Sequence, residues 1–342
     1  MQKHISYILL NGIPKGFAII CKIFLAGVIS IAILSTFSVA YYHTGLRIPC
    51  ESGTTDYHWE PNMLISTMKE GYSWIMTDEN GYNNASVPDS VDILLMGSSH
   101  MEAIEVSHNE NTAARLNKLF PELNTYNVGI SGHTIYRCVN NVESAINEYT
   151  PTRYIIIETN NISLNLEEMN AVVQGTSRRL PASNNGKLMT LLQKIPAFKP
   201  LYTQVDVWKN QGSEVANVID SSYTSDLYAP ILDSFLSIVG KAANNHGIKA
   251  IIFYDPPQHV AENGILDYAH TDEEITLFRK ACEDNGILFV DLTGYFDSFY
   301  QNNRILVHGF CNTAVGSGHL NKYGHQIIAE KLASVILEDL QQ

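Results

Sequence analysis

Four groups of glycine and polar residues follow short apolar runs in this sequence, and their types suit nucleophilic catalysis. A serine hydroxyl becomes a strong nucleophile when a nearby histidine removes its proton, and the resulting oxyanion needs N–H donors that are already in place. Glycine turns and asparagine amides can supply those donors. The four groups are Gly97-Ser98-Ser99-His100, residues 127–133 (NVGISGH), Glu158-Thr159-Asn160-Asn161 and residues 318–325 (GHLNKYGH).

This ordered series resembles the SGNH hydrolase superfamily, also called GDSL-type hydrolases, over residues 91–335. The blocks of that family supply a nucleophilic serine, an oxyanion glycine, an oxyanion asparagine and a general-base histidine. The resemblance implies that Ser99 is the nucleophile and His319 the base. It also implies that the oxyanion is held by the backbone N–H groups of Ser99 and Gly132 and by the side chain of Asn160, or else of Asn161.

The chain departs from the family pattern at two positions. Ser98 occupies the aspartate position of the first block, and Gly316 occupies the aspartate position of the last block. A carboxylate that orients the histidine is therefore expected from elsewhere in the chain. Asp291 and Asp255, which follow other apolar runs, are the candidates, and a Ser-His dyad held by a backbone carbonyl is the alternative.

Three further histidines, His100, His133 and His259, also follow predicted strands. We interpret them as residues that line a cleft. A metal cluster formed with His319 is the alternative, but no HExxH or paired carboxylate-histidine spacing supports it. The five cysteines show no zinc-ligand spacing either. We therefore expect neither a metal ion nor an organic cofactor.

Strands and helices that alternate along the chain must bring these groups together. Continuous apolar runs are typical of strands buried on both faces of a parallel sheet. The predicted fold is a three-layer α/β/α sandwich with a mostly parallel sheet, of the SGNH hydrolase or flavodoxin-like type, in which functional groups gather beyond the carboxyl ends of the strands. The predicted strands are 92–96, 125–128, 154–157, 250–254 and 288–290, and the predicted helices are 111–120, 136–149, 227–245, 272–285 and 322–340.

An uncharged segment, residues 23–42, is long enough to cross a membrane as a helix. Three lysines and no acid precede it, so the positive-inside rule places residues 1–22 in the cytoplasm. The alternative is a signal peptide cleaved at the small-x-small site Ser38-Val39-Ala40. We expect a single-pass protein of the cell membrane with an extracytoplasmic C-terminal domain, or a secreted protein if the segment is cleaved.

The rest of the chain divides into a linker and one domain. Residues 43–90, rich in Gly, Asn, Ser and Tyr, are expected to form an irregular linker. Residues 91–342 are expected to form the α/β domain, with an insertion at 163–224 where the alternation of strands and helices is interrupted.

The composition sets broad limits on function. A chain of 342 residues with 45% hydrophobic and 17% charged residues can bury a large core, which excludes a disordered or low-complexity protein. Its 35 acidic residues outnumber its 22 basic ones, for a net charge of −13, and no basic cluster is present. Nucleic-acid binding is therefore not expected.

These features together predict a serine esterase or O-acyltransferase that works through an acyl-serine intermediate. Resemblance to single-span envelope members of the superfamily implies that the substrate is an O-acyl group, acetyl above all, on a cell-envelope polysaccharide or related polymer. A small ester is the alternative substrate. The expected partners are that substrate, the membrane and a membrane-bound acyltransferase. The alternative, motivated by Gly316, is a catalytically degenerate domain that binds envelope glycan or the partner acyltransferase.

Overall fold

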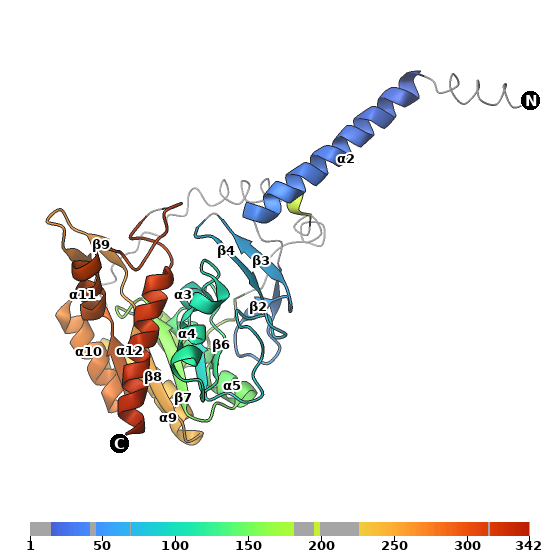
Figure 1. The fold of residues 1–342 in the computed structure, drawn as a ribbon. Helices are drawn as coiled ribbons and strands as arrows, with labels where there is room; N and C mark the ends of the chain where they lie inside the picture. The colour runs from blue at the N-terminus through green and yellow to red at the C-terminus, as the bar shows by residue number, and fades with distance from the viewer. Residues whose placement is uncertain are drawn as a thin grey trace, which may run out of the picture.

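The structure is a computed structural model that describes residues 15–41, 46–68, 70–180, 195–198, 226–313 and 315–341. The predicted cytoplasmic residues 1–14 and most of the predicted insertion lie outside the described residues. The described part contains one five-stranded sheet, three two-stranded sheets and the helices around them (Figure 1).

The five-stranded parallel sheet forms the centre of the fold. Four of its five strands are short runs rich in Ile, Leu, Val and aromatic residues, and the three middle strands are buried along almost their whole length. The order across the sheet is β11-β8-β7-β5-β6, and every neighbouring pair is parallel. The strand bounds are β5 (Ile93–Met96), β6 (Thr125–Asn127), β7 (Tyr154–Thr159), β8 (Lys249–Tyr254) and β11 (Ile287–Asp291).

Helices cover both faces of this sheet (Figure 1). Successive strand residues point to opposite faces. Leu94 and Ile155 therefore join one core cluster, while Ile93 and Ile156 join the other. The predicted three-layer α/β/α fold is confirmed. The first face is covered by α5 (Ile135–Tyr149), α6 (Leu166–Val173), α9 (Tyr228–Asn245) and α10 (Asp272–Asp284), and the second by α4 (Thr112–Leu119), α11 (Thr293–Asn303) and α12 (Lys322–Leu340).

The strand order creates a switch point at β5, because β6 pairs with one edge of β5 and β7 with the other. In open α/β sheets, ligands bind at such a point, outside the carboxyl ends of the strands. Residues 97–100 follow β5, and Asn160 follows β7. The topology therefore places two of the predicted groups at the expected binding crevice.

Residues 46–84 are more regular than the predicted linker. They form two antiparallel hairpins, whose residues Tyr57, Trp59, Ile65 and Ile75 make a small core with Ile104 and Ile130 of the main domain. The segment is therefore packed against the α/β domain. The strands are β1 (Arg47–Pro49), β2 (Tyr57–Trp59), β3 (Leu64–Thr67) and β4 (Ser73–Met76); β9 (Gln258–Val260) and β10 (Leu266–Tyr268) form a third hairpin, and the short helices are α3 (Ser99–Glu102), η1 (His108–Glu110) and η2 (Pro196–Phe198).

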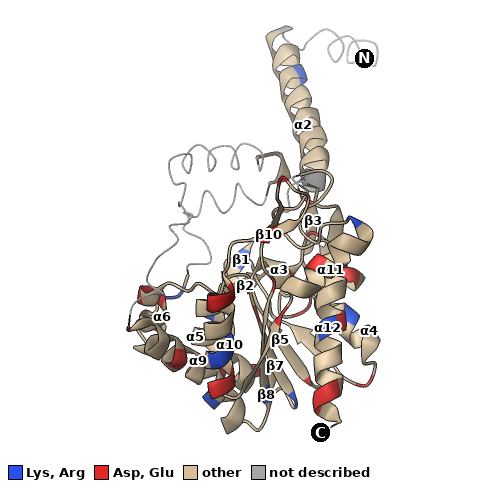
Figure 2. Ribbon diagram, turned by 90° about the vertical axis from the view of Figure 1, so that its left-hand side faces the viewer, with Lys and Arg blue, Asp and Glu red and all other residues tan. Residues whose placement is uncertain are grey.

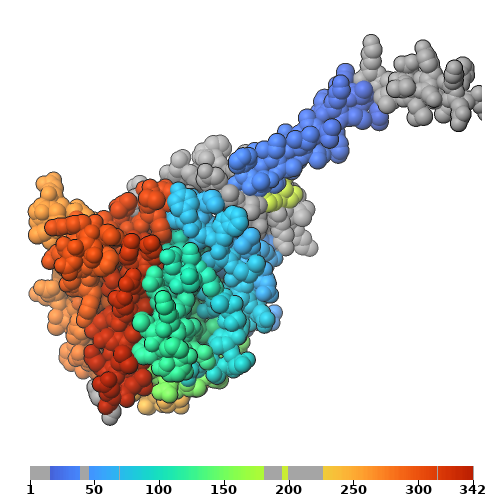
Figure 3. Space-filling model, in the orientation of Figure 1, coloured from blue at the N-terminus to red at the C-terminus, as the bar shows by residue number. Residues whose placement is uncertain are grey.

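A long apolar helix, α2 (Lys15–Tyr41), projects from this body (Figure 3). Its span Gly16–Ser38 is 23 residues long and carries its apolar side chains on the outside. The helix begins before the predicted position 23 and includes Lys22. Figure 2 shows the acidic residues on the body, with α2 almost free of charge. By length and composition α2 could cross a membrane or serve as a signal sequence.

Candidate active site

Ser99 is the first residue of α3, directly after the sharp turn that ends β5. Ser98 is the N-cap of this short helix, and its Oγ accepts a hydrogen bond from the His100 N–H at 3.3 Å. The Ser98 N–H donates to Glu158 Oε2 at 2.6 Å. Gly97 allows this approach, because a Cβ there would lie 2.7 Å from Glu158 Oε2. Ser98 thus has a structural role in the turn, and the half-buried Ser99 is left as the candidate nucleophile.

His319 is held at two points by the carboxylate of Glu70. Glu70 Oε2 lies 2.8 Å from His319 Nδ1, and Glu70 Oε1 accepts the His319 backbone N–H at 2.9 Å. A second carboxylate, Glu105, lies 3.4 Å from His319 Nδ1 through its Oε1. Glu70 therefore stands where an orienting acid of a catalytic triad would stand, and its bond to Nδ1 leaves Nε2 as the ring nitrogen available for proton transfer.

These carboxylates set the charge state of His319. Burial lowers the pKa of His319, but the hydrogen bond to Glu70 and the negative charge of Glu105 outweigh it and raise the pKa to about 9. Burial would raise the pKa of Glu70, but the hydrogen bonds from the His319 side chain and backbone keep it below its usual value. Burial raises the pKa of Glu105 to about 8. Glu70 is therefore the ionised partner of His319 at neutral pH.

His319 lies beside the turn that carries Ser99. The imidazole of His100, the residue after Ser99, meets the His319 ring edge-on with a distance of 5.9 Å between ring centroids. In the described residues no hydrogen bond joins the Ser99 hydroxyl to His319. The structure thus brings the two loops together without closing the serine-histidine contact.

The absence of an aspartate at position 316 has a steric explanation. Gly316 has φ +89°, a conformation that L side chains rarely adopt, and a Cβ there would lie 2.8 Å from Leu306 Cδ1. Gly318 also has φ +89°, and a Cβ there would lie 2.3 Å from Glu70 Oε1. The loop before His319 therefore excludes a side chain at both positions and lets Glu70 approach the histidine closely.

Neither predicted orienting acid contacts His319. Asp291 Oδ1 accepts the Thr293 N–H at 3.0 Å and the Thr293 hydroxyl at 2.6 Å, so Asp291 stabilises the turn after the edge strand β11. Asp255 Oδ2 lies 2.6 Å from His100 Nδ1. The prediction of Asp291 or Asp255 was wrong, because it considered only acids at the ends of sheet strands, whereas Glu70 comes from the turn between β3 and β4.

The predicted oxyanion donors differ in whether they already hold a hydrogen bond. In the described residues, the Ser99 and Gly132 N–H groups and the Asn160 side chain have no hydrogen-bond partner. Asn161, by contrast, is exposed, and its side chain bonds to the backbone of Ser163 at 2.9 and 3.2 Å. The geometry therefore favours Asn160 over Asn161.

Tyr57 flanks the turn that carries Gly132. Its hydroxyl donates to the Ser131 carbonyl at 2.6 Å, and it lies 2.9 Å from where a Cβ of residue 132 would be. Gly132 has φ +87°. A side chain at this position would therefore collide with Tyr57 and strain the turn.

The three histidines predicted to line a cleft occupy different surroundings. His100 is buried with its Nδ1 on Asp255. His133 is buried and its Nε2 accepts the Asp56 N–H at 3.2 Å. His259 lies exposed on β9, with its Nε2 3.1 Å from Asp267. Of the three, only His100 contacts His319.

Comparison with known proteins gives matches among solved structures only; no family model and no curated protein matches the chain. The psychrotrophic esterase EstA from Pseudoalteromonas sp. shares 13% identity over 73% of this chain and 98% of its own, with a TM-score of 0.38. The acetyl xylan esterase AlAXEase shares 15% identity over 71% of this chain and 98% of its own, with a TM-score of 0.40. A member of the lipolytic G-D-S-L family from Veillonella parvula DSM 2008 shares 13% identity over 72% of this chain and 98% of its own, with a TM-score of 0.34.

The chain is similar to esterases and GDSL-type hydrolases. The activity proposed below rests on the geometry of the site.

Glu70 is the candidate site residue that the sequence did not reveal. Glu70-Gly71 lies between the short segments that form β3 (LIST) and β4 (SWIM), each of which mixes apolar and polar residues. That pattern is a hairpin signal, and a Glu-Gly turn between short strands is the feature that could have drawn attention to residue 70.

Proposed function

We propose that this protein is an SGNH-type serine esterase or O-acyltransferase that works through an acyl-Ser99 intermediate. The observation that carries the proposal is the Glu70–His319 pair beside the Ser99 turn. A histidine fixed at Nδ1 by a carboxylate, next to a serine at a strand-helix turn, is the arrangement that activates a hydroxyl for attack on an ester.

The proposed steps give each of these groups one role. Neutral His319 takes the hydroxyl proton of Ser99 while the serine oxygen attacks the ester carbonyl carbon. The carbonyl oxygen becomes an oxyanion, which the Ser99 and Gly132 N–H groups and the Asn160 amide stabilise. His319 then gives its proton to the leaving alcohol oxygen as the C–O bond breaks.

The acyl-Ser99 intermediate is resolved by a second hydroxyl. Water, or a sugar hydroxyl, gives its proton to His319 and attacks the acyl carbon, and Ser99 leaves with the proton returned to it. Water yields a hydrolase and the sugar yields a transferase. The same residues serve both outcomes.

We further propose that the acyl group is acetyl and that it is carried by a cell-envelope polysaccharide. The apolar helix α2 supports this proposal, because an anchor would keep the catalytic body at the membrane surface. The resemblance of the motifs to envelope members of the superfamily supports it as well. A membrane-bound acyltransferase that supplies acyl groups is the partner proposed for the transferase reaction.

The degenerate binding domain is the weaker proposal. Its motivation was the missing aspartate at Gly316, and the bonds from Glu70 to His319 supply a carboxylate in its place. This substitution supports turnover over binding without chemistry.

The test is ester hydrolysis by the full-length chain in detergent, with p-nitrophenyl acetate as the substrate. We expect a burst of p-nitrophenol equal to one per active site, followed by slower turnover, because acylation releases the phenol before water frees Ser99. Ser99→Ala should abolish the burst. Ser98→Ala, a matched control from the same turn, should retain it. A folded wild-type protein without burst or turnover would contradict the proposal.

A second measurement separates the hydrolase from the transferase. An acetyl donor is supplied with and without an acceptor oligosaccharide, and acetate and acetylated sugar are both measured. A transferase gives acetylated sugar at the expense of free acetate. If acetate is the one product formed in the presence of the acceptor, the protein is a hydrolase.

A further inference from the structure

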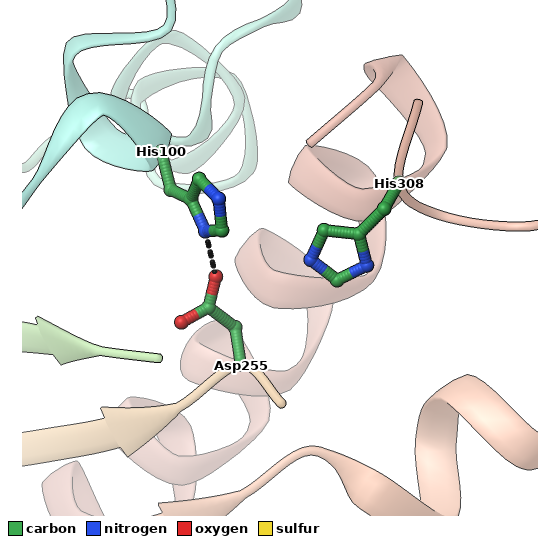
Figure 4. Close-up of side chains that lie close together, drawn as sticks. All are labelled: His100, Asp255 and His308. Atoms are coloured by element: carbon green, nitrogen blue, oxygen red, sulfur yellow. Dashed lines mark hydrogen bonds and ion pairs between the residues drawn. The ribbon is translucent and has the colours of Figure 1, made fainter. Parts of the chain in front are cut away.

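Three side chains with metal-binding atoms converge in the interior beneath the Ser99 turn (Figure 4). His100 is the second residue of α3, Asp255 follows β8, and His308 lies in the loop before His319. One nitrogen or oxygen atom from each lies within 4.8 Å of the others. All three residues are at least nine-tenths buried, with exposed fractions of 7%, 0% and 2%.

Several buried polar atoms in this cluster or on neighbouring residues lack hydrogen-bond partners. His308 Nε2, Asp255 Oδ1, Glu158 Oε1 and Gln258 Oε1 are buried without a hydrogen bond, and they are four of the seven such side-chain atoms in the described residues. Figure 4 shows one nitrogen of His308 turned toward His100 and Asp255. Buried polar atoms are rarely left unpaired, so the unpaired nitrogen of His308 beside His100 and Asp255 calls for a missing partner.

The charge of the cluster points in the same direction. The buried carboxyl groups of Asp255 and Glu158 lie 2.6 and 3.9 Å from His100 Nδ1. In the described residues no lysine or arginine forms an ion pair with either carboxyl group. A carboxylate at this depth is costly unless it is paired or bound to a metal, and within the described residues His100 is the one ion-pair partner of either group.

We propose that His100, Asp255 and His308 bind one divalent transition-metal ion, with Zn²⁺ as the best match. Two imidazoles and one carboxylate suit Zn²⁺, whereas Mg²⁺ and Ca²⁺ prefer sites made of oxygen atoms alone. Three protein ligands leave a fourth position, which the unpartnered Glu158 Oε1 or a water can fill.

The surroundings can orient these ligands. Gln258 Nε2 lies 3.2 Å from His308 Nδ1. With the amide turned over, Gln258 Oε1 accepts a proton from Nδ1, and the lone pair of His308 Nε2 is then free for the ion. Binding requires His100 Nδ1 to lose any proton it shares with Asp255, so uptake of the metal releases protons.

The ion would connect the two loops of the active site. His100 directly follows Ser99. The backbone of His308 forms a β-bridge with Leu320, and its carbonyl oxygen accepts the Gly316 N–H at 2.9 Å. These contacts hold the loop on both sides of His319. The ion is thus a positioning element for the Ser99 and His319 loops, and its binding is independent of whether the proposed esterase reaction occurs.

The test is zinc binding to the full-length chain in detergent, without a polyhistidine tag, after removal of metal by a chelator. We expect one Zn²⁺ per chain by calorimetric titration, with proton release that is revealed by repeating the titration in a second buffer. His308→Gln should weaken binding at least about 100-fold, since loss of an outer-shell partner alone costs 10- to 100-fold. His259→Gln, which changes an exposed histidine, should bind as the wild type does.

Thermal unfolding shows whether each variant is folded. Zn²⁺ should raise the melting temperature of the wild type and of His259→Gln but leave that of His308→Gln unchanged, while the metal-free proteins unfold with similar cooperativity. Asp255→Asn is the second ligand variant and should lose the same shift. Absence of zinc binding by the wild type, or equal zinc binding by His308→Gln and Asp255→Asn, would overturn the proposal.

Discussion

The Glu70 carboxylate holds both the backbone and the side chain of His319, with Oε1 2.9 Å from the His319 nitrogen and Oε2 2.8 Å from Nδ1. This bidentate contact fixes the position, the orientation and the tautomer of the imidazole together. The segment that carries Glu70 lies before the α/β domain in sequence, so the proposed site takes one residue from outside the central sheet.

Replacement of Glu70 by glutamine should lower kcat/KM for p-nitrophenyl acetate roughly 10³- to 10⁴-fold, because the amide can donate to Nδ1 and favour the wrong tautomer. The measurement is steady-state hydrolysis at several pH values. Glu79→Gln, which removes an exposed acid three residues beyond β4, should leave the rate unchanged. A loss of less than tenfold in Glu70→Gln would contradict the orienting role.

The pH dependence of hydrolysis should follow the pKa of His319. Burial lowers that pKa, but the Glu70 hydrogen bond and the Glu105 charge raise it to about 9, and only neutral His319 can accept the Ser99 proton. We therefore expect kcat/KM to rise with pH up to about 9. Glu70→Gln removes a negative charge that stabilises the imidazolium of His319, so the pKa of His319 should fall. The rising part of the pH profile should then move to lower pH. If the rising part of the profile stayed at the same pH in Glu70→Gln, a group other than His319 would control it.

Gly318→Ala should reduce activity much more than a matched glycine substitution elsewhere. The new Cβ would meet Glu70 Oε1 at 2.3 Å and break the contact with His319. Gly286→Ala is the control, because Gly286 has φ +68° with nothing within 4 Å of the added carbon. Both should lose about 1–2 kcal/mol of stability from the left-handed backbone conformation.

Hydrolysis assays and denaturant unfolding distinguish these two effects. If Gly286→Ala lost as much activity as Gly318→Ala, the effect would be one of backbone strain, and the close approach of Glu70 would not explain it.

Asn160→Ala should lower kcat about 10²- to 10³-fold with little change in KM, since an oxyanion donor acts mainly in the transition state. Asn161→Ala removes only bonds to the Ser163 backbone and should change kcat little. The kinetic constants of the two variants decide between the residues. The reverse ranking would move the oxyanion role to Asn161.

The central sheet could be predicted from the sequence because its strands are continuous apolar runs. β8 was predicted as 250–254 and spans Lys249–Tyr254, and α12 matches its predicted range of 322–340. The carboxyl ends of such strands meet at one edge, which is why the groups at Ser99 and Asn160 could be placed together.

The orienting acid could not be predicted in the same way. β3 and β4 have four residues each, too few to show a clear period, and the approach of Glu70 to His319 joins residues 249 positions apart. The His100–Asp255 pair depends in the same way on how the segments after β5 and β8 approach each other across the sheet. These contacts are tertiary, and no local pattern encodes them.

The most direct test of the account is covalent labelling of the full-length chain by a fluorophosphonate, with the modified residue located by peptide mass spectrometry. Such a probe reacts with a serine that a neighbouring base has activated. The account predicts labelling of Ser99 in the wild type and in Ser98→Ala, and none in Ser99→Ala or His319→Ala. A folded wild-type protein that is not labelled, or is labelled at Ser98, would contradict it.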